Sequence, residues 1–445
     1  MMTRTMPPDS RPALRIGVVG LGTVGIAVIR LLETNAELIA RRAGRPIRVV
    51  AISARDAAKS RDIDVSPYRW EIDPIAIATA SDVDAVVELI GGSEGAAIDL
   101  AHAALAAGKP LVTANKAMIA HHGMALATIA DAGDIPLKFE AAVAGGIPVI
   151  KALREGASAN HITRVYGILN GTCNFILTRM EAEGRDFGDV LAEAQANGFA
   201  EADPSFDIDG VDAAHKLSIL AAMCFGTRLA FEHVATTGIR DILLADIREA
   251  EALGYRVRLI GMAEQDGGAA IGATDTLAQR IQPCLVPAEH PLAYVPGALN
   301  AVVAEGNFVG RLFLEGAGAG GGPTASAVVA DIIDVARDEY GPAFAMPVDQ
   351  LVAAQPADAG AHVGKSYIRL HVADRTGVLA DIAIAMRDAC VSVESFIQRG
   401  SHDGTALIAL VTHSGEARSV ADAIARLATS PHLIGKPMVM PILDL

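Results

Sequence analysis

The chain has 445 residues, of which 51% are hydrophobic and only 4% aromatic, and its formal net charge is −15 at pH 7. The length allows two or three domains, and the excess of acidic residues argues against nucleic acid and anionic membrane surfaces as partners. The four cysteines show no metal-ligand spacing, the N-terminus lacks the apolar segment of a signal peptide, and no apolar run is long enough for a membrane span. We therefore expect a cytoplasmic protein.

The first predicted strand, residues 14–20, leads into the pattern Gly20-x-Gly22-x-x-Gly25 and then into an apolar helix. A glycine turn between a strand and a helix lets a pyrophosphate approach the backbone and the helix N-terminus. The context favours dinucleotide binding over a glycine turn that serves only packing.

The second predicted strand, residues 47–54, should end near the ribose of such a dinucleotide. An acidic residue there would bind the 2′-hydroxyl of NAD(H), whereas this chain offers Ser53, Arg55 and Lys59, with Asp56 as the nearby acid. We therefore favour NADP(H), with NAD(H) possible. The alternative is that the two cations are merely solvated.

Further strands are predicted within 83–92 and 109–116, and they alternate with Ala-rich helical stretches. This alternation predicts a Rossmann-like, doubly wound parallel sheet in an α/β protein. Lys116 follows the last of these strands, at the edge where open α/β sheets bind ligands. It is a candidate for contact with substrate or cofactor, although a surface lysine at a helix start is the alternative.

Two motifs follow the parallel sheet. Residues 140–147 form a small-residue turn whose carbonyls could converge on a monovalent cation, with an interdomain hinge as the alternative. Residues 170–174 form a tight turn before a helix, and this turn contains Cys173. A thiolate nucleophile is conceivable at that helix N-terminus, but no base is evident, and a small buried cysteine is the favoured interpretation.

The acidic block at 198–217, GFAEADPSFDIDGVDAAHKL, places five carboxylates before a predicted helix that carries Lys216. Asp212 and Lys216 are four residues apart and so share one helix face. A polar pocket that holds a small charged substrate and moves a proton would need such a cluster, and a structural salt bridge is the alternative. A calcium loop is excluded, because Lys216 occupies the position where that loop needs a glutamate.

The remaining sequence predicts two more parts. Residues 138–315 mix strands and Ala-rich helices in an α+β catalytic and dimerisation domain, and residues 316–345 return to complete the nucleotide-binding domain of 14–137. After a linker at 346–366, residues 367–445 follow the order βαββαβ, which is typical of a ferredoxin-like module. Residues 1–13 are expected to be a flexible tail.

Six motifs together carry a resemblance to a known family: GLGTVG, TANK, EAAVAGGIP, GILNGTCNFIL, the acidic block and GAGAGGGPTASAVVADI. In this order they resemble the homoserine dehydrogenases over about residues 14–340. The C-terminal module resembles an ACT domain through its segment DRTGVLADIA. The resemblance implies NADPH- or NADH-dependent reduction of L-aspartate 4-semialdehyde to L-homoserine, on the route to threonine and methionine.

The resemblance also implies roles for individual residues. Lys216 matches the lysine that protonates the nascent alkoxide, Asp212 its helix partner, and Lys116 a lysine that contacts cofactor and substrate. Glu201 matches the carboxylate that binds the substrate ammonium group, and Asp207 another substrate-site acid. We expect the two ammonium groups, which come from separate domains, to meet at the aldehyde oxygen.

Further matches concern ligands and partners. The backbone carbonyls of a sodium site would come from Glu140, Val143, Gly145 and Ile147, and further nucleotide contacts from Thr23, Val24 and Gly320. ACT modules associate, so a homodimer or homotetramer is expected, with threonine as the expected effector. Two other classes stay open: an acylating semialdehyde dehydrogenase that uses Cys173, and a non-catalytic sensor of NADP or an amino acid.

Overall fold

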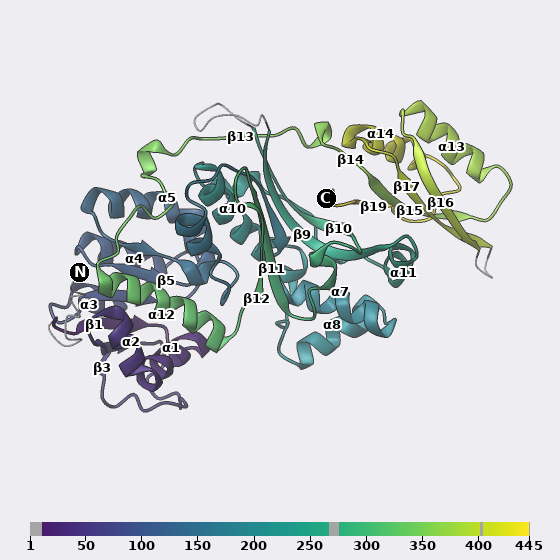
Figure 1. Cartoon of the computed structure of the whole chain (residues 1–445). Coiled ribbons are helices and arrows are strands. Elements are labelled where there is room, and N and C mark those ends of the chain that lie inside the picture. The colour runs from purple at the N-terminus through teal and green to yellow at the C-terminus, as the bar shows by residue number, and fades with distance from the viewer. Residues whose placement is uncertain (1–10, 267–275, 401–403, 445) are drawn as a thin grey trace.

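In a computed structural model of the chain, residues 11–266, 276–400 and 404–444 are described. The predicted tail therefore lies mostly outside the described residues. Three parts follow one another across Figure 1: a helix-covered sheet of the first third of the chain, a tall central sheet, and a small sheet with two helices near the C-terminus. Among the described helices, none has the length and apolarity to cross a membrane.

The first part is a six-stranded parallel sheet of order β3-β2-β1-β4-β5-β6. Its strands are β1 (Leu14–Val19), β2 (Ile47–Ser53), β3 (Arg69–Glu71), β4 (Ala85–Glu88), β5 (Leu111–Thr113) and β6 (Leu137–Lys138). Its helices are α1 (Thr23–Thr34), α2 (Ala36–Ala43), α3 (Pro74–Thr79), α4 (Ala96–Ala106), α5 (Lys116–Gly133) and α12 (Gly321–Arg337). The predicted doubly wound parallel sheet is confirmed.

Alternate residues of the parallel strands supply two cores, one on each face of the sheet. Ile16 and Val18 of β1 pack with α1, α2 and α12, whereas Val19 and Val86 pack with α3, α4 and α5. Strands that are buried on both faces have nearly continuous apolar, β-branched sequences, and the sequence LRIGVV of β1 has this pattern.

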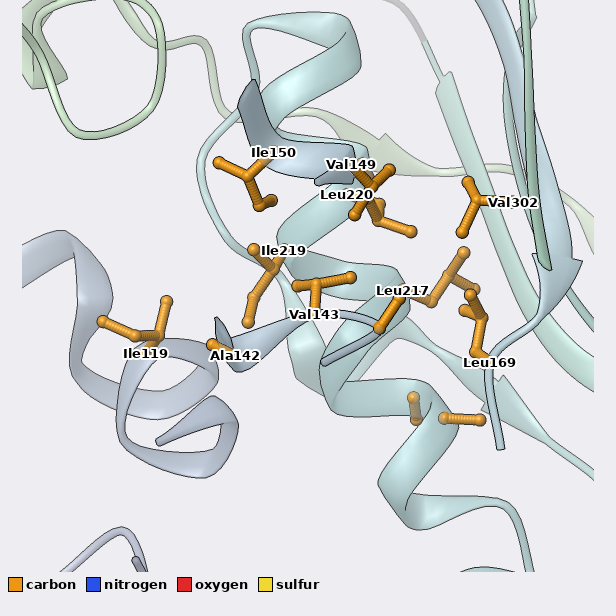
Figure 2. Close-up of a cluster of buried hydrophobic side chains, with 14 of the residues drawn as sticks. Ile119, Ala142, Val143, Val149, Ile150, Leu169, Leu217, Ile219, Leu220 and Val302 are labelled. Carbon is orange, nitrogen blue, oxygen red and sulfur yellow. The ribbon is translucent and has the colours of Figure 1, made fainter. Parts of the chain in front are cut away.

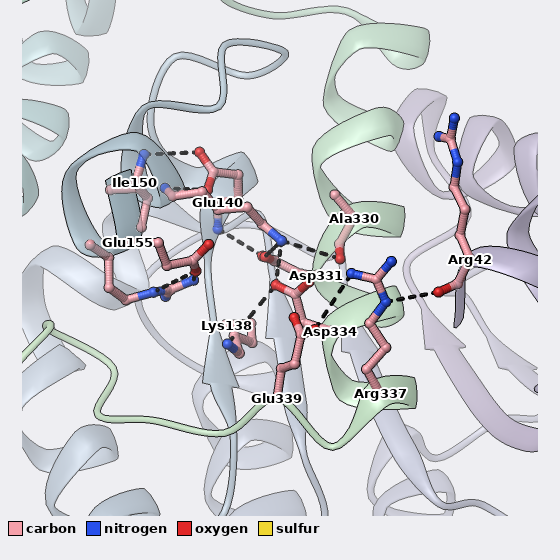
Figure 3. A network of polar contacts seen from close by, with 12 residues as sticks. Arg42, Lys138, Glu140, Ile150, Glu155, Ala330, Asp331, Asp334, Arg337 and Glu339 are labelled. Atoms are coloured by element: carbon pink, nitrogen blue, oxygen red, sulfur yellow. Dashed lines mark hydrogen bonds and ion pairs between the residues drawn. The ribbon is translucent and has the colours of Figure 1, made fainter. Parts of the chain in front are cut away.

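Helix α12 returns from late in the chain to lie against α1 and α2. Figure 3 shows the polar network that fastens it. The Glu140 carboxylate accepts bonds from the backbone N–H groups of Ile150 (2.9 Å) and Lys151 (2.8 Å), and the Glu140 N–H donates to Asp331 of α12 (2.8 Å). Lys151 pairs with Asp334 of α12. Burial, then the charge of Asp331, raises the pKa of Glu140 to about 7.

The second part is a mixed, mainly antiparallel sheet of order β12-β11-β7-β9-β10-β13, with β8 paired to β10. Its strands are β7 (Ile162–Ile168), β8 (Ala235–Thr236), β9 (Tyr255–Asp266), β10 (Thr276–Pro287), β11 (Leu299–Gly306), β12 (Gly310–Ala317) and β13 (Gln355–Pro356). Its helical elements are η1 (Glu140–Ala142), α6 (Val149–Lys151), η2 (Ala152–Gly156), α7 (Gly171–Glu183), α8 (Phe187–Ala196), α9 (Ser205–Ile208), α10 (Val211–Phe225), η3 (Phe231–His233), α11 (Leu244–Ala252), η4 (Pro291–Tyr294) and η5 (Val348–Gln350).

Helix α10 is buried along nearly its whole length, and it packs on both α5 and the mixed sheet (Figure 2). Leu217 and Leu220 point toward the mixed sheet near Val302, while Ile219 and Val143 face Ile119 of α5. Because interiors are close-packed, this continuous contact fixes α5 and α10 relative to each other.

The third part is an antiparallel sheet of order β16-β17-β15-β19, and its chain order confirms the predicted βαββαβ module. Its elements are η6 (Ala359–Ala361), β14 (Val363–Gly364), β15 (Ser366–Ala373), α13 (Val378–Asp388), β16 (Val393–Gly400), β17 (Thr405–Thr412), β18 (Gly415–Glu416), α14 (Ala417–Leu427) and β19 (Met438–Pro441). One sheet face packs on α13 and α14. The other face meets α11, where Arg369 pairs with Asp246 (2.8 Å).

Candidate active site

The glycine turn after β1 has the geometry that a dinucleotide site needs. Gly20 has φ +101°, and a Cβ there would lie 2.3 Å from the Leu89 carbonyl oxygen. A Cβ on Gly25 would lie 1.9 Å from the Gly20 oxygen, whereas the space beside Gly22 is open. Two glycines are thus required by close packing, and the third leaves room for a phosphate.

Two helix N-termini meet beside this turn. Helix α1 begins at Thr23, followed by Val24, and α12 begins directly after Gly320, which has φ +108°. A Cβ on Gly321 would lie 3.2 Å from both the Thr23 side chain and its carbonyl oxygen, so the two helices start side by side. Converging N-termini carry unpaired N–H groups and partial positive charge, which suits a pyrophosphate.

Arg55 follows the carboxyl end of β2 and is exposed. The strand's last residue, Ser53, is buried, and its carbonyl accepts a bond from Gly20 N (2.9 Å). Asp56 accepts bonds from the N–H groups of Ala58 and Lys59, so it closes a turn. This leaves Arg55 accessible at the edge where a ribose phosphate would lie.

Asp212 is the centre of the polar cluster between the first two parts. Its Oδ1 pairs with Lys116 Nζ at 2.9 Å, and its Oδ2 pairs with Lys216 Nζ at 2.7 Å. The Asn170 side-chain amide also donates to Oδ2 at 2.8 Å. Burial alone would raise the pKa of Asp212, but the charges of Lys216 and Lys116 outweigh burial and hold it well below its usual range. The two predicted lysines therefore meet at one ionised carboxylate.

Lys216 is held in a fixed direction. Besides Asp212, its ammonium donates to the Leu169 carbonyl at 2.7 Å, and the same carbonyl accepts a bond from Asn300 at 2.8 Å. The side chain is only 9% exposed, compared with 34% for Lys116. An ammonium has three N–H donors, so two are occupied and one is left for a substrate.

Asn170 organises the acids around the lysines. It caps α7 by accepting a bond from Cys173 N (2.8 Å), and its amide donates to Asp207 (2.8 Å) as well as to Asp212. Burial, then the charge of Asp212, raises the pKa of Asp207. Glu201 is exposed nearby. Burial would lower the pKa of Lys116, but Asp212, with smaller contributions from Asp207 and Glu201, raises it.

Cys173 is fully buried, and its thiol donates to the Asp207 carbonyl at 3.2 Å. Burial, then the neighbouring aspartates, raises the pKa of this thiol well above its usual value. A nucleophilic cysteine needs the opposite shift. The favoured interpretation of a small buried cysteine fits the structure.

The turn at 140–147 is buried, and Gly145 has φ +52°, with its Cβ position 2.4 Å from the Gly318 oxygen. The Glu140 carbonyl accepts a bond from Val143 N (3.3 Å), and the Ile147 carbonyl one from Val149 N (2.7 Å). Each carbonyl has a second lone pair, so all four predicted oxygens keep a free position for a cation. Oxygen donors of this kind suit a hard cation.

A cleft of about 520 Å³ opens beside Lys116, between the parallel sheet and α10. Gly91, Gly92 and Asn115 line it on one side, and Phe206 and His215 on the other. The cleft thus joins the carboxyl edge of the parallel sheet to the lysine cluster, which is where a nucleotide and a small substrate can meet.

Sequence reasoning missed several residues of this cluster. Asn170 precedes a helix as a good N-cap should, so its capping role could have been found. Asn300 lies inside β11 and gave no local signal, and His215 was read only as part of the acidic block.

Three family models match successive parts of the chain. Residues 20–140 match the model "Homoserine dehydrogenase, NAD binding domain", residues 148–333 match "Homoserine dehydrogenase", and residues 366–431 match "ACT domain". A homoserine dehydrogenase of Pseudomonas aeruginosa is 44% identical over 93% of this chain and 95% of its own length. One of Neisseria gonorrhoeae is 43% identical over 96% and 98%. The crystal structure of a Thiobacillus denitrificans homoserine dehydrogenase superposes with a TM-score of 0.90 at 42% identity, covering 97% of this chain and 98% of that one.

Proposed function

The chain belongs to the homoserine dehydrogenase family, and on that premise we propose how its residues interconvert L-aspartate 4-semialdehyde and L-homoserine. One observation carries the mechanism: a single buried carboxylate, Asp212, holds the ammonium groups of Lys116 and Lys216 from two different parts of the fold. Paired cations at one edge of a cleft suit a reaction in which negative charge develops on an oxygen.

NADP(H) is the proposed cofactor, with NAD(H) as the alternative. The support is the glycine turn with Gly20, Gly22 and Gly25, the adjoining helix N-termini with Thr23, Val24 and Gly320, and the accessible cation Arg55. A solved hyperthermophilic archaeal homoserine dehydrogenase mutant, 28% identical with a TM-score of 0.62, is in complex with NADPH. When bound, the nicotinamide supplies the hydride for the aldehyde carbon.

Lys216 is the proposed proton donor to the nascent alkoxide. Asp212 and the Leu169 carbonyl occupy two of its N–H groups, so the third is directed before the substrate arrives. Such preorganisation stabilises the developing charge without reorganisation at the moment of reaction. Lys116, which is more exposed, adds a second positive charge and would contact the cofactor when it is bound.

Glu201 and Asp207 are the proposed substrate-binding acids. Glu201 is exposed, so its carboxylate is available to the ammonium group of the substrate. Asp207 is fixed by Asn170 at 2.8 Å and by Thr172 at 3.3 Å. Two anchored ends hold the aldehyde in one orientation toward the lysines.

The test measures oxidation of NADPH and of NADH with aspartate semialdehyde for the wild type and Arg55→Glu. We expect turnover with at least one nucleotide. We also expect Arg55→Glu to lower kcat/KM for NADPH about tenfold or more while leaving that for NADH within about twofold, since a carboxylate repels a 2′-phosphate. An equal fall for both nucleotides would contradict the role of Arg55. No oxidation of either by the wild type would contradict the mechanism.

Other features complete the proposal. The carbonyls of Glu140, Val143, Gly145 and Ile147 would hold a monovalent cation, sodium, that ties the turn to its surroundings. Threonine is the proposed effector of the ACT domain, and a homodimer or homotetramer the proposed assembly. The four free cysteines fit the proposed cytoplasmic location.

The division of the chain into domains is also part of the proposal. The nucleotide-binding domain would comprise 14–137 and 316–345, and the catalytic domain 138–315. A linker at 346–366 would lead to the regulatory domain at 367–445.

A further inference from the structure

Helices α5 and α10 make two polar contacts besides the apolar packing of Ile119 against Ile219, and the Lys116–Asp212 ion pair is one of them. Lys116 opens α5 and pairs with Asp212 in the first turn of α10 (2.9 Å). One turn and a half further along α5, His121 Nε2 lies 3.1 Å from Nε2 of His215, the residue before Lys216. Each helix therefore contributes a catalytic cluster residue and an imidazole to the same crossing.

The two contacts differ in stiffness. A lysine reaches its partner through a flexible four-carbon stem, so the Lys116 ion pair by itself leaves the direction of the ammonium group loosely defined. Imidazoles have short side chains with two torsions, and a hydrogen bond between two of them defines a direction as well as a distance. The second contact removes the freedom that the first leaves.

Aromatic rings hold the imidazoles in place. His215 is 3% exposed and stacks on Phe231, with ring centroids 4.4 Å apart and planes 26° apart. His121 meets the same Phe231 ring edge-on at 4.8 Å. Phe206 lies 5.6 Å from His215, and the Lys116 ammonium lies 5.8 Å from the Phe206 centroid. The same box of rings thus contacts both histidines and the lysine.

Protonation decides whether the histidine contact exists. One Nε2 must carry hydrogen and the other a lone pair. His215 Nδ1 is buried and has no hydrogen-bond partner among the described residues. A buried unpaired N–H is costlier than an unpaired lone pair, so we assign hydrogen to His215 Nε2 and the acceptor role to His121.

The surroundings keep His215 neutral. Burial, then the charge of His121, lowers the pKa of His215 to about 4, and Asp212 opposes this while Lys116 and Lys216 add to it. His121, in contrast, is exposed.

We propose that the His121–His215 contact is an interdomain clamp that positions Lys116 at the active site. The clamp rests on the proposed role of Lys116. Without this contact Lys116 would lose its fixed approach to the reacting oxygen, and turnover would fall while substrate affinity changed little.

The test compares three substitutions on one helix in the full-length enzyme: Lys116→Met, His121→Leu and His122→Leu. His122 is the matched control, because it is the next residue along α5 and pairs with Glu94 (3.2 Å) rather than with α10. Measurements are kcat and KM for both substrates from about pH 5 to about pH 8, the range in which a histidine changes charge.

We expect His121→Leu to lower kcat on the order of tenfold at neutral pH, with KM values within about twofold, because misplacing a catalytic group costs rate rather than affinity. His121→Gln, whose amide oxygen can still accept a bond, should recover most of the loss, and His122→Leu should match the wild type.

A second pair of variants, which changes His215, tests the same contact from its other side. His215→Leu and the double variant His121→Leu/His215→Leu should fall no further than His121→Leu alone, because one contact is lost in each. If the buried His215 variants do not fold, the exposed His121 variants decide.

Wild-type kcat in His121→Leu, or an equal loss in His122→Leu, would overturn the clamp. If Lys116→Met also retains wild-type kcat, the proposed role of Lys116 fails instead. The two failures are therefore distinguishable.

Discussion

Two buried aspartates stand at the two junctions of the molecule, and they are built differently. Asp212 lies in the first turn of α10, where the nucleotide-binding part meets the central sheet, and Asp246 lies in the first turn of α11, where the central part meets the ACT sheet. Each is less than 5% exposed and each has a basic partner. Asp212 has two ammonium groups and an amide, whereas Asp246 has Arg369 (2.8 Å), the Tyr367 hydroxyl (3.1 Å) and one backbone N–H.

The pKa values of Asp212 and Asp246 shift in opposite directions. Burial raises the pKa of Asp246, and the charge of Arg369 does not fully compensate. At Asp212 two cations exceed the effect of burial, and the pKa falls. The comparison shows that one buried cation serves to join surfaces, while a second one makes a carboxylate that stays charged and can hold a proton donor in place.

The largest effect is expected from the substitution of Lys216, which Asp212 holds. Lys216→Met should lower kcat by about 10²–10⁴-fold with little change in KM, because the donor to the alkoxide is lost. Lys436→Met, at an exposed position far along the chain, is the control and should behave as the wild type. Steady-state kinetics of both variants check this. Turnover near the wild-type rate in Lys216→Met would remove the proposed proton donor.

Asp212→Asn should also weaken the fold. It leaves two ammonium groups facing a neutral amide, and we expect the free energy of unfolding to fall by about 3 kcal/mol, the size found when a buried ion pair is broken. Denaturant titration measures it. A loss under about 1 kcal/mol would mean that the lysines find other partners.

Asp246→Asn should lower the free energy of unfolding by less, about 1 kcal/mol. The fold disfavours the charged form of Asp246, and an amide can keep the hydrogen bonds that this carboxyl group makes. The Leu243 N–H donates to Asp246 at 2.9 Å, and Asn can accept that bond. The same titration applies. If the free energy of unfolding falls as much as in Asp212→Asn, the proposed difference between the two buried aspartates is wrong.

The pH dependence of stability should further distinguish Asp212→Asn from Asp246→Asn. The depressed pKa of Asp212 contributes stability above its unfolded-state pKa of about 3.9, and that contribution is lost as pH falls through the folded-state value. The raised pKa of Asp246 acts the other way, so its contribution is present below about pH 3.9 and is lost as pH rises through the folded-state value. From about pH 4 to about pH 7, unfolding measurements should show the deficit of Asp246→Asn shrinking and that of Asp212→Asn unchanged.

The smallest effect is expected at the rim of the ACT junction. Arg399 pairs with Glu249 of α11, but its side chain is 61% exposed. Arg399→Ala should change the free energy of unfolding by about 0.5 kcal/mol, as is usual for exposed ion pairs. The loss should disappear at high salt, and a loss above about 2 kcal/mol would make this pair a principal docking contact.

Local sequence patterns were enough to predict the features that depend only on neighbouring residues. The strand, glycine turn and helix at 14–25 follow from β-branched residues beside glycines, and the shared face of Asp212 and Lys216 follows from helical spacing. That Lys116 and Lys216 lie close together was expected only from the family resemblance, since no spacing rule joins two domains. Asn300 and the His121–His215 contact depend on packing between segments far apart in the sequence, and local patterns carry no signal for such pairs.

The return of α12 to the first sheet has a consequence for synthesis. A ribosome has already released the six parallel strands when Gly321–Arg337 is still to be made, so the core of α1 and α2 stays uncovered on one side until then. The central part must therefore begin to fold while its predecessor is incomplete. A chain that stops before α12 would lack Val328 and Ile332, which share one buried core with Val28 and Ile29 of α1, and such fragments should be recognised by chaperones rather than accumulate as free nucleotide binders.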